Sequence, residues 1–176
     1  MITVGDRQFT VFIDQTTIQT REAALASELN RDYNGRQPLL VGVLNGSFMF
    51  AADLMKRLTI PCEISFVKFA SYHRTASTGQ VDELFGLNED LAGRHVLVLE
   101  DIVDTGLTVR SLLAHLRAQN PASLAVATLL FKPDALQYPE SQPQYVGFAI
   151  ENRFVLGYGL DYGGLGRNLP DLHVVV

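Results

Sequence analysis

The chain has 176 residues, of which 47% are hydrophobic, and this is enough for one well-buried domain with a small appendage but not for two full domains. Aspartate and glutamate outnumber lysine and arginine by 19 to 14, which gives a net charge of -5. Nucleic-acid-binding proteins usually carry a basic surface, so this charge argues against nucleic acid as a partner. A polyanionic ligand would need a local cluster of cations or a metal ion.

The sequence shows no sign of export, membrane insertion or a structural zinc site. It begins without the basic start and apolar run of a signal peptide, and its apolar stretches are shorter than a membrane span. The single Cys62 has no partner for an internal disulfide, and the four histidines lack the spacing of zinc ligands. We therefore expect a cytoplasmic protein with no membrane partner.

Apolar periodicity predicts strands and helices that alternate along most of the chain. In chain order, the expected elements are a helix at 20–29, a strand at 39–44, a helix at 48–58, a strand at 62–71, a polar segment at 72–81, a strand from Val96, a helix at 108–118 and a strand at 124–131. This alternation is typical of a parallel α/β sheet with right-handed crossovers.

The pattern changes after Pro133. Pro139 and Pro143 indicate irregular chain, and short strands are expected at 145–150, 154–157 and 173–176. This tail is too small for a core of its own, so we expect it to pack as a hood over the carboxyl edge of the sheet, together with the strand-like residues 9–13. The prediction is a single domain of residues 1–176, with its core at about 36–135 and its hood at about 1–15 and 136–176.

Residues 96–108 combine an apolar strand with an acidic pair and a polar turn before a helix. Four apolar residues at 96–99 are typical of a strand buried on both faces. Glu100 and Asp101 follow and suit sugar hydroxyls or a hydrated cation. The next turn can direct backbone N–H groups and hydroxyls to a phosphate, in front of the positive end of a helix, from Asp104, Thr105, Gly106 and Thr108. This predicts a site for a ribose that carries a phosphate; the alternative is a simple helix cap.

This stretch resembles the phosphoribosyl-pyrophosphate (PRPP) signature of type I phosphoribosyltransferases. The chain has no Walker-type Gly-Lys-Ser/Thr and no Gly-x-Gly-x-x-Gly, which argues against a triphosphatase or a dinucleotide site. From about residue 39 to 170 the chain resembles hypoxanthine-guanine phosphoribosyltransferases of the shorter microbial type. The resemblance rests on the segments 44–47, 71–79, 100–108 and 130–133 with 146–162. It implies the type I phosphoribosyltransferase fold, in which helices flank a parallel twisted sheet and a small hood covers it.

The resemblance implies transfer of ribose 5-phosphate from PRPP to N9 of a 6-oxopurine, which is hypoxanthine, guanine or xanthine, with release of pyrophosphate. Mg2+ is the implied cofactor, because a multiply charged leaving group calls for a hard cation with oxygen ligands. The implied partners are PRPP and the purine base, and the implied assembly is a homodimer or homotetramer.

The resemblance assigns roles to four carboxylates. Glu100 and Asp101 would bind the ribose hydroxyls or magnesium waters, and their negative charge suits a ribose ring that becomes cationic. Asp161 would hold a second magnesium through water. Asp104 would be the general base that exchanges a proton with N7 of the purine. The alternatives are a helix cap for Asp104 and a solvated surface charge for Asp161.

The resemblance also assigns the residues that bind phosphate groups. The 5'-phosphate would lie in a cradle formed by Thr105, Gly106, Leu107 and Thr108. Pyrophosphate would contact Asn45, Gly46 and Arg167, and the peptide bond before Asn45 would be cis. Ser71 and Tyr72 would belong to a loop that closes over the pyrophosphate and excludes water. For this loop the alternative is an ordinary solvated hairpin.

Three residues would bind the purine. Lys132 ends an apolar strand and would donate to O6, which favours oxopurines over adenine. Phe154 would stack on the base, and the backbone of Val155 would accept a hydrogen bond from the purine edge. The alternatives are that Lys132 extends its charge into solvent and that Phe154 belongs to the core.

The sequence departs from the family pattern at two of these positions. Leu107 stands where many relatives carry Lys or Asn, which puts a side-chain contact to the phosphate in doubt. Asn45 stands where several relatives carry Lys or Arg, which leaves the interface between subunits uncertain.

Two competing interpretations stay open at this point. One keeps the fold but changes the base, and the segments around Lys132 and Phe154 argue against adenine and orotate but not against xanthine. The other is a regulator with a PRPP fold that binds RNA, like the pyrimidine attenuation proteins. It would need a basic face, which the acidic composition disfavours.

Overall fold

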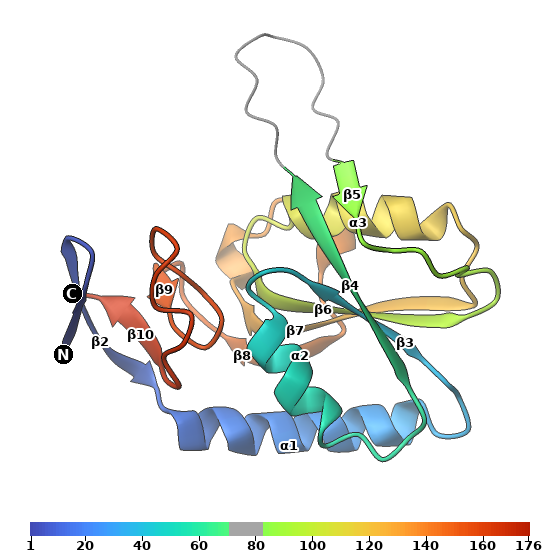
Figure 1. Ribbon diagram of the computed structural model, residues 1–176, viewed down its shortest axis with the longest axis horizontal. Coiled ribbons are helices and arrows are strands. Elements are labelled where there is room, and N and C mark those ends of the chain that lie inside the picture. The colour runs from blue at the N-terminus through green and yellow to red at the C-terminus, as the bar shows by residue number, and fades with distance from the viewer. Residues whose placement is uncertain (71–82) are drawn as a thin grey trace, which may run out of the picture.

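A mixed sheet of six strands forms the centre of the computed structural model, which describes residues 1–70 and 83–176 (Figure 1). Five strands run parallel, and β5 pairs with β4 in the antiparallel direction. The strand order is β5-β4-β3-β6-β7-β8, and the strands are β3 (Leu39–Val43), β4 (Glu63–Ala70), β5 (Glu83–Phe85), β6 (His95–Val103), β7 (Ser123–Phe131) and β8 (Tyr145–Ala149). The structure confirms the predicted parallel α/β fold.

Helices cover both faces of this sheet. They are α1 (Gln15–Asp32), α2 (Phe48–Met55) and α3 (Leu107–Arg117). All of β3 is buried; Leu40 packs in the cluster that contains α1 and α2, whereas Leu39 and Val41 pack in the cluster that contains α3. Alternate residues of one strand thus enter two separate cores, as expected of a parallel strand. Figure 1 shows α1 and α3 on opposite sides of the sheet.

Helix α1 is longer than the sequence predicts, because its first turn is polar. We expected a helix at 20–29, but the helix begins at Gln15. The side chain of Asp14 accepts a hydrogen bond of 2.8 Å from the backbone N–H of Thr17 and so caps this turn. Apolar periodicity cannot reveal a turn that a cap stabilises.

The hood is a separate antiparallel sheet built from the two ends of the chain. Its order is β1-β2-β10-β9, and the strands are β1 (Ile2–Val4), β2 (Arg7–Ile13), β9 (Val155–Leu156) and β10 (Leu172–Val175). Phe9 of β2 and Val174 of β10 are buried. Both termini lie at this end of the molecule in Figure 1. The predicted hood of N- and C-terminal segments is therefore confirmed.

One strand that we assigned to the hood belongs to the central sheet. Tyr145–Ala149 pairs in parallel with β7. Gly147 permits this close pairing, since a Cβ there would overlap the carbonyl oxygen of Leu129. Arg21 of α1 donates to the carbonyl of Gly147 at 3.0 Å and to that of the preceding residue at 2.8 Å, which covers the outer edge of β8. The expected hood boundary at about residue 136 is thus too early.

Ser71 and Tyr72 of the predicted closing loop lie outside the described residues, which are interrupted at 71–82. Among the helices of the described part, none is long and apolar enough to cross a membrane.

Candidate active site

The connections of the sheet diverge between β3 and β6. Strand β3 is followed by α2 and then β4 on one side, whereas β6 is followed by α3 on the opposite face and then by β7 on the other side. Open α/β sheets bind ligands at the carboxyl ends of such strands. Strand β6 also extends past β3, because its pairing with β3 ends at Leu99 and its pairing with β7 continues to Val103. The acidic pair lies on this extension.

Glu100 and Asp101 gather negative charge at this edge. Glu100 is buried, and its Oε2 has no hydrogen-bond partner among the described residues. Burial and the neighbouring Asp101 raise the pKa of Glu100 well above its usual range, and burial also raises the pKa of Asp101. An oxygen-rich pair with unused acceptor capacity fits ribose hydroxyls or a hydrated Mg2+.

The turn between β6 and α3 has the shape of an anion site. Together with the end of β6, it lines a cavity of about 270 Å³. Gly106 directly precedes α3 with φ of 85°, and the side chain that accepts a hydrogen bond from the first N–H of this helix, that of Leu107, is Thr105 at 3.4 Å and not Asp104. The interpretation of Asp104 as a helix cap is therefore wrong. The other N–H groups of the first turn stay available to a bound anion, as does the positive end of the helix dipole.

A second segment, residues 137–141, holds this turn in place through two hydrogen bonds, and sequence reasoning did not single it out. Ser141 Oγ donates to the carbonyl of Gly106 at 2.8 Å, and the backbone N–H of Gln137 donates to that of Thr105 at 3.0 Å. Both donors lie in or beside short 3-10 turns that begin at Pro133 and Pro139. These prolines mark the turns in the sequence, but only the fold brings them under the loop.

If this turn binds the 5'-phosphate, as the resemblance implies, Gly106→Ala should weaken PRPP binding, because φ of 85° disfavours a side chain and a Cβ would lie 2.8 Å from the Cβ of Ser141. We expect the KM for PRPP to rise about tenfold or more, which is the effect of losing one good hydrogen bond. Gly35→Ala is the matched control, since Gly35 also has positive φ, 73°, but no heavy atom within 4 Å of its Cβ position. Equal PRPP kinetics in both variants would contradict the role of the turn.

The structure brings Asp104 and Lys132 together at a second cavity, of about 190 Å³. Lys132 Nζ donates to Asp104 Oδ2 at 2.7 Å and to Asn152 Oδ1 at 3.2 Å. The Lys132 side chain is only 7% exposed, so the interpretation of a lysine that reaches into solvent is wrong. Asn152, which sequence reasoning missed, holds the lysine in place.

Phe154 lies at the mouth of this cavity. It is 40% exposed, so the interpretation as a core residue is wrong. Its ring packs against Tyr162 with centroids 5.7 Å apart and against Phe9 at 6.3 Å. The neighbouring Val155 is buried and also lines the cavity. Phe154 is thus an aromatic surface that the hood supports from behind.

Asp161 and Arg167 form an ion pair in the hood rather than two separate surface charges. Arg167 Nη2 lies 2.5 Å from Asp161 Oδ1, and Nη1 donates to the carbonyl of Gly159 at 2.7 Å. The second oxygen of Asp161 accepts from the backbone N–H of Gly164 at 2.6 Å. Asp161 lines the same cavity as Asp104 and Lys132.

The turn after β3 lies beside the acidic pair. The Leu44–Asn45 peptide bond is cis, as the resemblance implies. Gly46 is in close contact with Asp101, because a Cβ on this glycine would overlap the carboxylate. Asn45 is exposed. Apart from Ser71 and Tyr72, the predicted site residues thus gather at one edge of the sheet and the hood beside it.

The fold, and the site at the carboxyl edge of its central sheet, indicate the class of protein. The family model for the phosphoribosyl transferase domain matches residues 14–163. The chain therefore belongs to the phosphoribosyltransferases.

Relatives narrow the class. The chain is 40% identical over 166 residues to the hypoxanthine-guanine phosphoribosyltransferase of Streptococcus pneumoniae, covering 94% of this chain and 92% of the relative. It is 40% identical over 165 residues to the hypoxanthine-guanine-xanthine phosphoribosyltransferase of Tritrichomonas foetus, with 94% and 90% covered. The crystal structure of a Bacillus anthracis hypoxanthine-guanine phosphoribosyltransferase is 32% identical, with a TM-score of 0.85 and 96% and 99% of the chains covered.

The chain is thus a 6-oxopurine phosphoribosyltransferase of purine salvage, in the hypoxanthine-guanine group. This confirms the predicted family and activity. It also decides against the adenine, orotate and RNA-binding interpretations, while xanthine stays open as a substrate.

Proposed function

We propose that the site transfers the 5-phosphoribosyl group of PRPP to N9 of hypoxanthine, guanine or xanthine with the residue roles that follow. The observation that carries this proposal is the pairing of Lys132 with Asp104 in a cavity that lies between the phosphate turn and Phe154. A ribose 5-phosphate in the turn would present its C1' toward a purine in that cavity.

The sugar and its phosphates bind along the edge of the sheet. The 5'-phosphate accepts hydrogen bonds from the backbone at residues 105–108, with the end of α3 behind it. Glu100 and Asp101 bind the ribose hydroxyls, and their negative charge stabilises the ring as it becomes cationic in the transition state. The leaving pyrophosphate lies between the turn at Gly46 and Arg167.

Where the purine binds, Lys132 is the hydrogen-bond donor and Asp104 is the general base. Lys132 has three N–H bonds, of which two point to Asp104 and Asn152 in the described structure, and the third donates to the purine O6. As N9 forms its bond to C1', the bond from C1' to the pyrophosphate oxygen breaks. The proton on N7 then passes to Asp104, and pyrophosphate leaves with the electron pair.

We also propose that Mg2+ is required. Glu100 and Asp101 would hold one ion directly or through water, and the orphaned Oε2 of Glu100 supports this assignment. Asp161 would hold a second ion through water, because its two oxygens already pair with Arg167 and the backbone N–H of Gly164. When bound, the ion neutralises negative charge on pyrophosphate. Removal of divalent cations with a chelator should abolish turnover and added Mg2+ should restore it; full turnover in the chelator would contradict the proposal.

One panel of steady-state rates tests the proposed chemistry. Hypoxanthine, guanine, xanthine and adenine are each supplied with PRPP and Mg2+, and nucleotide and pyrophosphate are measured. We expect turnover with at least one 6-oxopurine and release of one pyrophosphate per nucleotide. A protein that used none of the three would contradict the proposal.

Phe154→Leu should raise the KM for the purine about tenfold, because leucine keeps an apolar surface but loses stacking, which is worth about 1–3 kcal/mol. The KM for PRPP should change less than about threefold. Phe12→Leu is the control, since Phe12 is also a partly buried hood phenylalanine but does not line the purine cavity. An unchanged purine KM in the Phe154 variant would refute stacking.

We further propose that the enzyme is cytoplasmic and forms a homodimer or homotetramer. Phe48, which begins α2, and Phe66 of β4 are 41% and 36% exposed, and large exposed apolar side chains are common at subunit interfaces. Light scattering after size-exclusion chromatography measures the mass directly. A mass of one chain at micromolar concentration would contradict an oligomer.

A further inference from the structure

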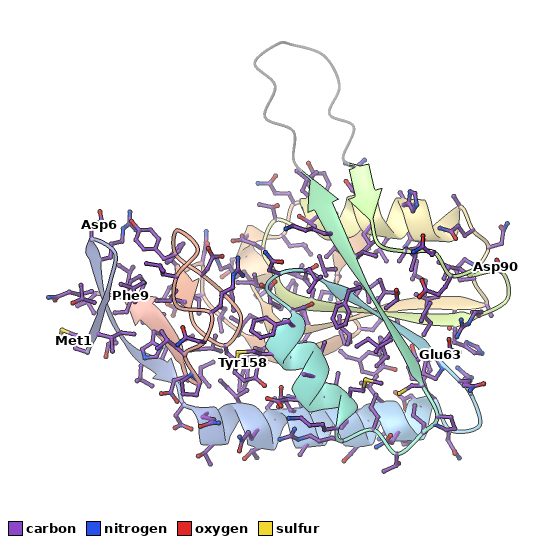
Figure 2. The ribbon with its side chains drawn as sticks, viewed as in Figure 1. Met1, Asp6, Phe9, Glu63, Asp90 and Tyr158 are labelled. Carbon is purple, nitrogen blue, oxygen red and sulfur yellow. The ribbon has the colours of Figure 1, made fainter. Side chains whose placement is uncertain are left out.

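The buried hydroxyl of Tyr158 lies between two carboxyl groups, those of Glu22 and Asp53, which come from distant segments of the chain. Tyr158 follows β9 in the hood, Glu22 lies on α1 and Asp53 lies on α2. Tyr158 Oη is 2.7 Å from Glu22 Oε1 and 2.6 Å from Asp53 Oδ2. Tyr158 is 2% exposed and Glu22 is 0% exposed. Figure 2 shows Tyr158 beside α2 and above α1, at the place where the hood meets these helices.

The hydroxyl has only one proton to donate, so it cannot satisfy two carboxylates. One carboxyl must therefore carry a proton and donate it to Oη. Burial raises the pKa of Glu22 to about 7. Burial acts in the same direction on Asp53, but hydrogen bonds from Lys56 and Tyr158 outweigh it and lower its pKa. Below about pH 7, Glu22 is thus the group that carries the proton, and Tyr158 donates to the Asp53 carboxylate.

Two cations face this cluster from α2 and the residues that follow it. Lys56 pairs with Asp53. Arg57 Nη1 lies 3.6 Å from Glu22 Oε2 but donates to the carbonyl of Asp53 at 2.8 Å. Glu22 Oε2 itself has no hydrogen-bond partner among the described residues. The cations therefore balance the charge of Asp53 better than that of an ionised Glu22.

The backbone at Tyr158 leads directly to the pyrophosphate side of the site. Tyr158 has φ of 48°, which is uncommon for a residue other than glycine. The next residue, Gly159, packs on the turn after β3, because a Cβ there would overlap the carbonyl oxygen of Gly46. The carbonyl of Gly159 accepts the hydrogen bond from Arg167, which in turn pairs with Asp161. Tyr158 thus anchors a turn that contacts Gly46 and Arg167 and, through Arg167, is linked to Asp161.

We propose that Tyr158, Glu22 and Asp53 form a positioning unit that holds the hood turn against Gly46 and so sets the places of Arg167 and Asp161 for PRPP and pyrophosphate. The proposal rests on the proposed function, since the pyrophosphate roles of Gly46 and Arg167 are part of it. The unit does not line the phosphate or purine cavity, and it acts on the substrate only through the turn.

Tyr158→Phe tests the unit, because it keeps the ring and removes only the hydroxyl. We expect kcat/KM for PRPP to fall about 10- to 100-fold, the scale of a misplaced binding group, while the KM for the purine stays within about twofold. Tyr145→Phe is the matched control: Tyr145 Oη donates to Asp32 at 3.0 Å, which links β8 to α1 away from the site. We expect normal PRPP kinetics for this variant.

Glu22→Gln separates positioning from a merely structural role. Its amide can donate to Tyr158 Oη without a titrating proton, so we expect PRPP kinetics close to those of the unmodified protein at pH 6. Burial raises the pKa of Glu22 from 4.5 to about 7 on folding, so its contribution to stability is present at low pH and the melting temperature should fall as pH rises from about 4.5 to about 7. The KM for PRPP should rise as Glu22 of the folded protein loses its proton, at pH values around 7. Both dependences should flatten in the glutamine variant.

These experiments distinguish failure of the proposed function from failure of the positioning unit alone. If the unmodified protein does not use PRPP with any oxopurine, the proposed function fails. If it does, and Tyr158→Phe leaves the KM and kcat/KM for PRPP unchanged, the positioning unit fails alone. Equal losses for PRPP and purine, or a glutamine variant that keeps the full pH dependence, would also overturn the unit. A selective PRPP defect in Tyr158→Phe, together with near-normal PRPP kinetics at pH 6 and a flattened pH dependence in Glu22→Gln, supports it.

Discussion

Asp104→Asn should lower kcat by about 10²- to 10⁴-fold, the range expected when a general acid-base group is lost. The amide keeps the shape of the side chain and can still accept a hydrogen bond from Lys132, but it cannot take the N7 proton. In the proposed mode of binding, PRPP is held mainly by the backbone of the turn at residues 105–108, by Glu100 and Asp101 and by Arg167, and not by Asp104. The KM for PRPP should therefore change less than about threefold, and single-turnover and steady-state kinetics with hypoxanthine measure both effects.

Asp134→Asn is the matched control for this experiment. Asp134 is an exposed carboxylate two residues after Lys132, outside both cavities. Asp134→Asn should hardly change stability, whereas Asp104→Asn should lower it, because the Lys132 side chain is only 7% exposed and loses its counter-charge. Normal turnover with Asn at position 104 would remove the base from the mechanism and leave Asp104 as a partner that only orients Lys132.

The sequence predicts the central strands well because burial on both faces leaves a local record. Residues 39–43 and 96–99 are continuous apolar runs, and both lie inside the sheet. The phosphate turn is equally local, since residues 104–108 follow one another in the chain. Patterns of this kind depend on neighbours in sequence, so they can be read without the fold.

Strand β8 shows where local information ends. Its place depends on a close approach of Gly147 to Leu129 and on Arg21 from the first helix, and these contacts span 18 and 126 residues. A short strand of mixed residues fits a hood or a sheet edge equally well. Only the long-range contacts decide between them, and for that reason the assignment to the hood was wrong.

The pairing of Asp104 with Lys132 depends on the register of two strands. Val103 of β6 lies opposite Phe131 of β7, so the residues that follow them emerge side by side. The sequence proposes each residue separately but does not fix this register. Once the register is known, a base and a donor at the same edge follow directly, 28 residues apart in the chain.

The sequence alone indicates that Glu22 is buried. Ile18, Leu25 and Leu29 form the apolar stripe of α1, and Glu22 lies on that stripe by helical spacing. A carboxylate at such a position requires a buried partner. The sequence could raise this question, but only the fold identifies Tyr158 and Asp53 as the answer.

The remaining large effect concerns specificity, and it depends on Lys132. The Lys132 side chain is nearly buried, and its ammonium donates hydrogen bonds to Asp104 and Asn152. In the proposed mode of binding, the third N–H donates to the O6 acceptor of hypoxanthine, guanine or xanthine. Adenine would place its 6-amino donor against this donor, whose side chain is only 7% exposed. Sites that require one particular hydrogen bond reject an analogue without it by as much as 10⁴–10⁵-fold in kcat/KM.

We therefore expect the unmodified protein to use adenine about 10⁴-fold less efficiently than its best oxopurine, measured as kcat/KM at saturating PRPP. Lys132→Met fills a similar volume without the donor, so it should lower kcat/KM for oxopurines by about 10²-fold or more and leave the low adenine rate nearly unchanged. The ratio between the two bases should shrink but not invert, because Asp104 would still face the ring. Lys68→Met, a change of the same kind on β4, should leave the ratio intact. Adenine use comparable with that of hypoxanthine by the unmodified protein would refute selection through O6, and an unchanged ratio in Lys132→Met would assign that selection to another residue.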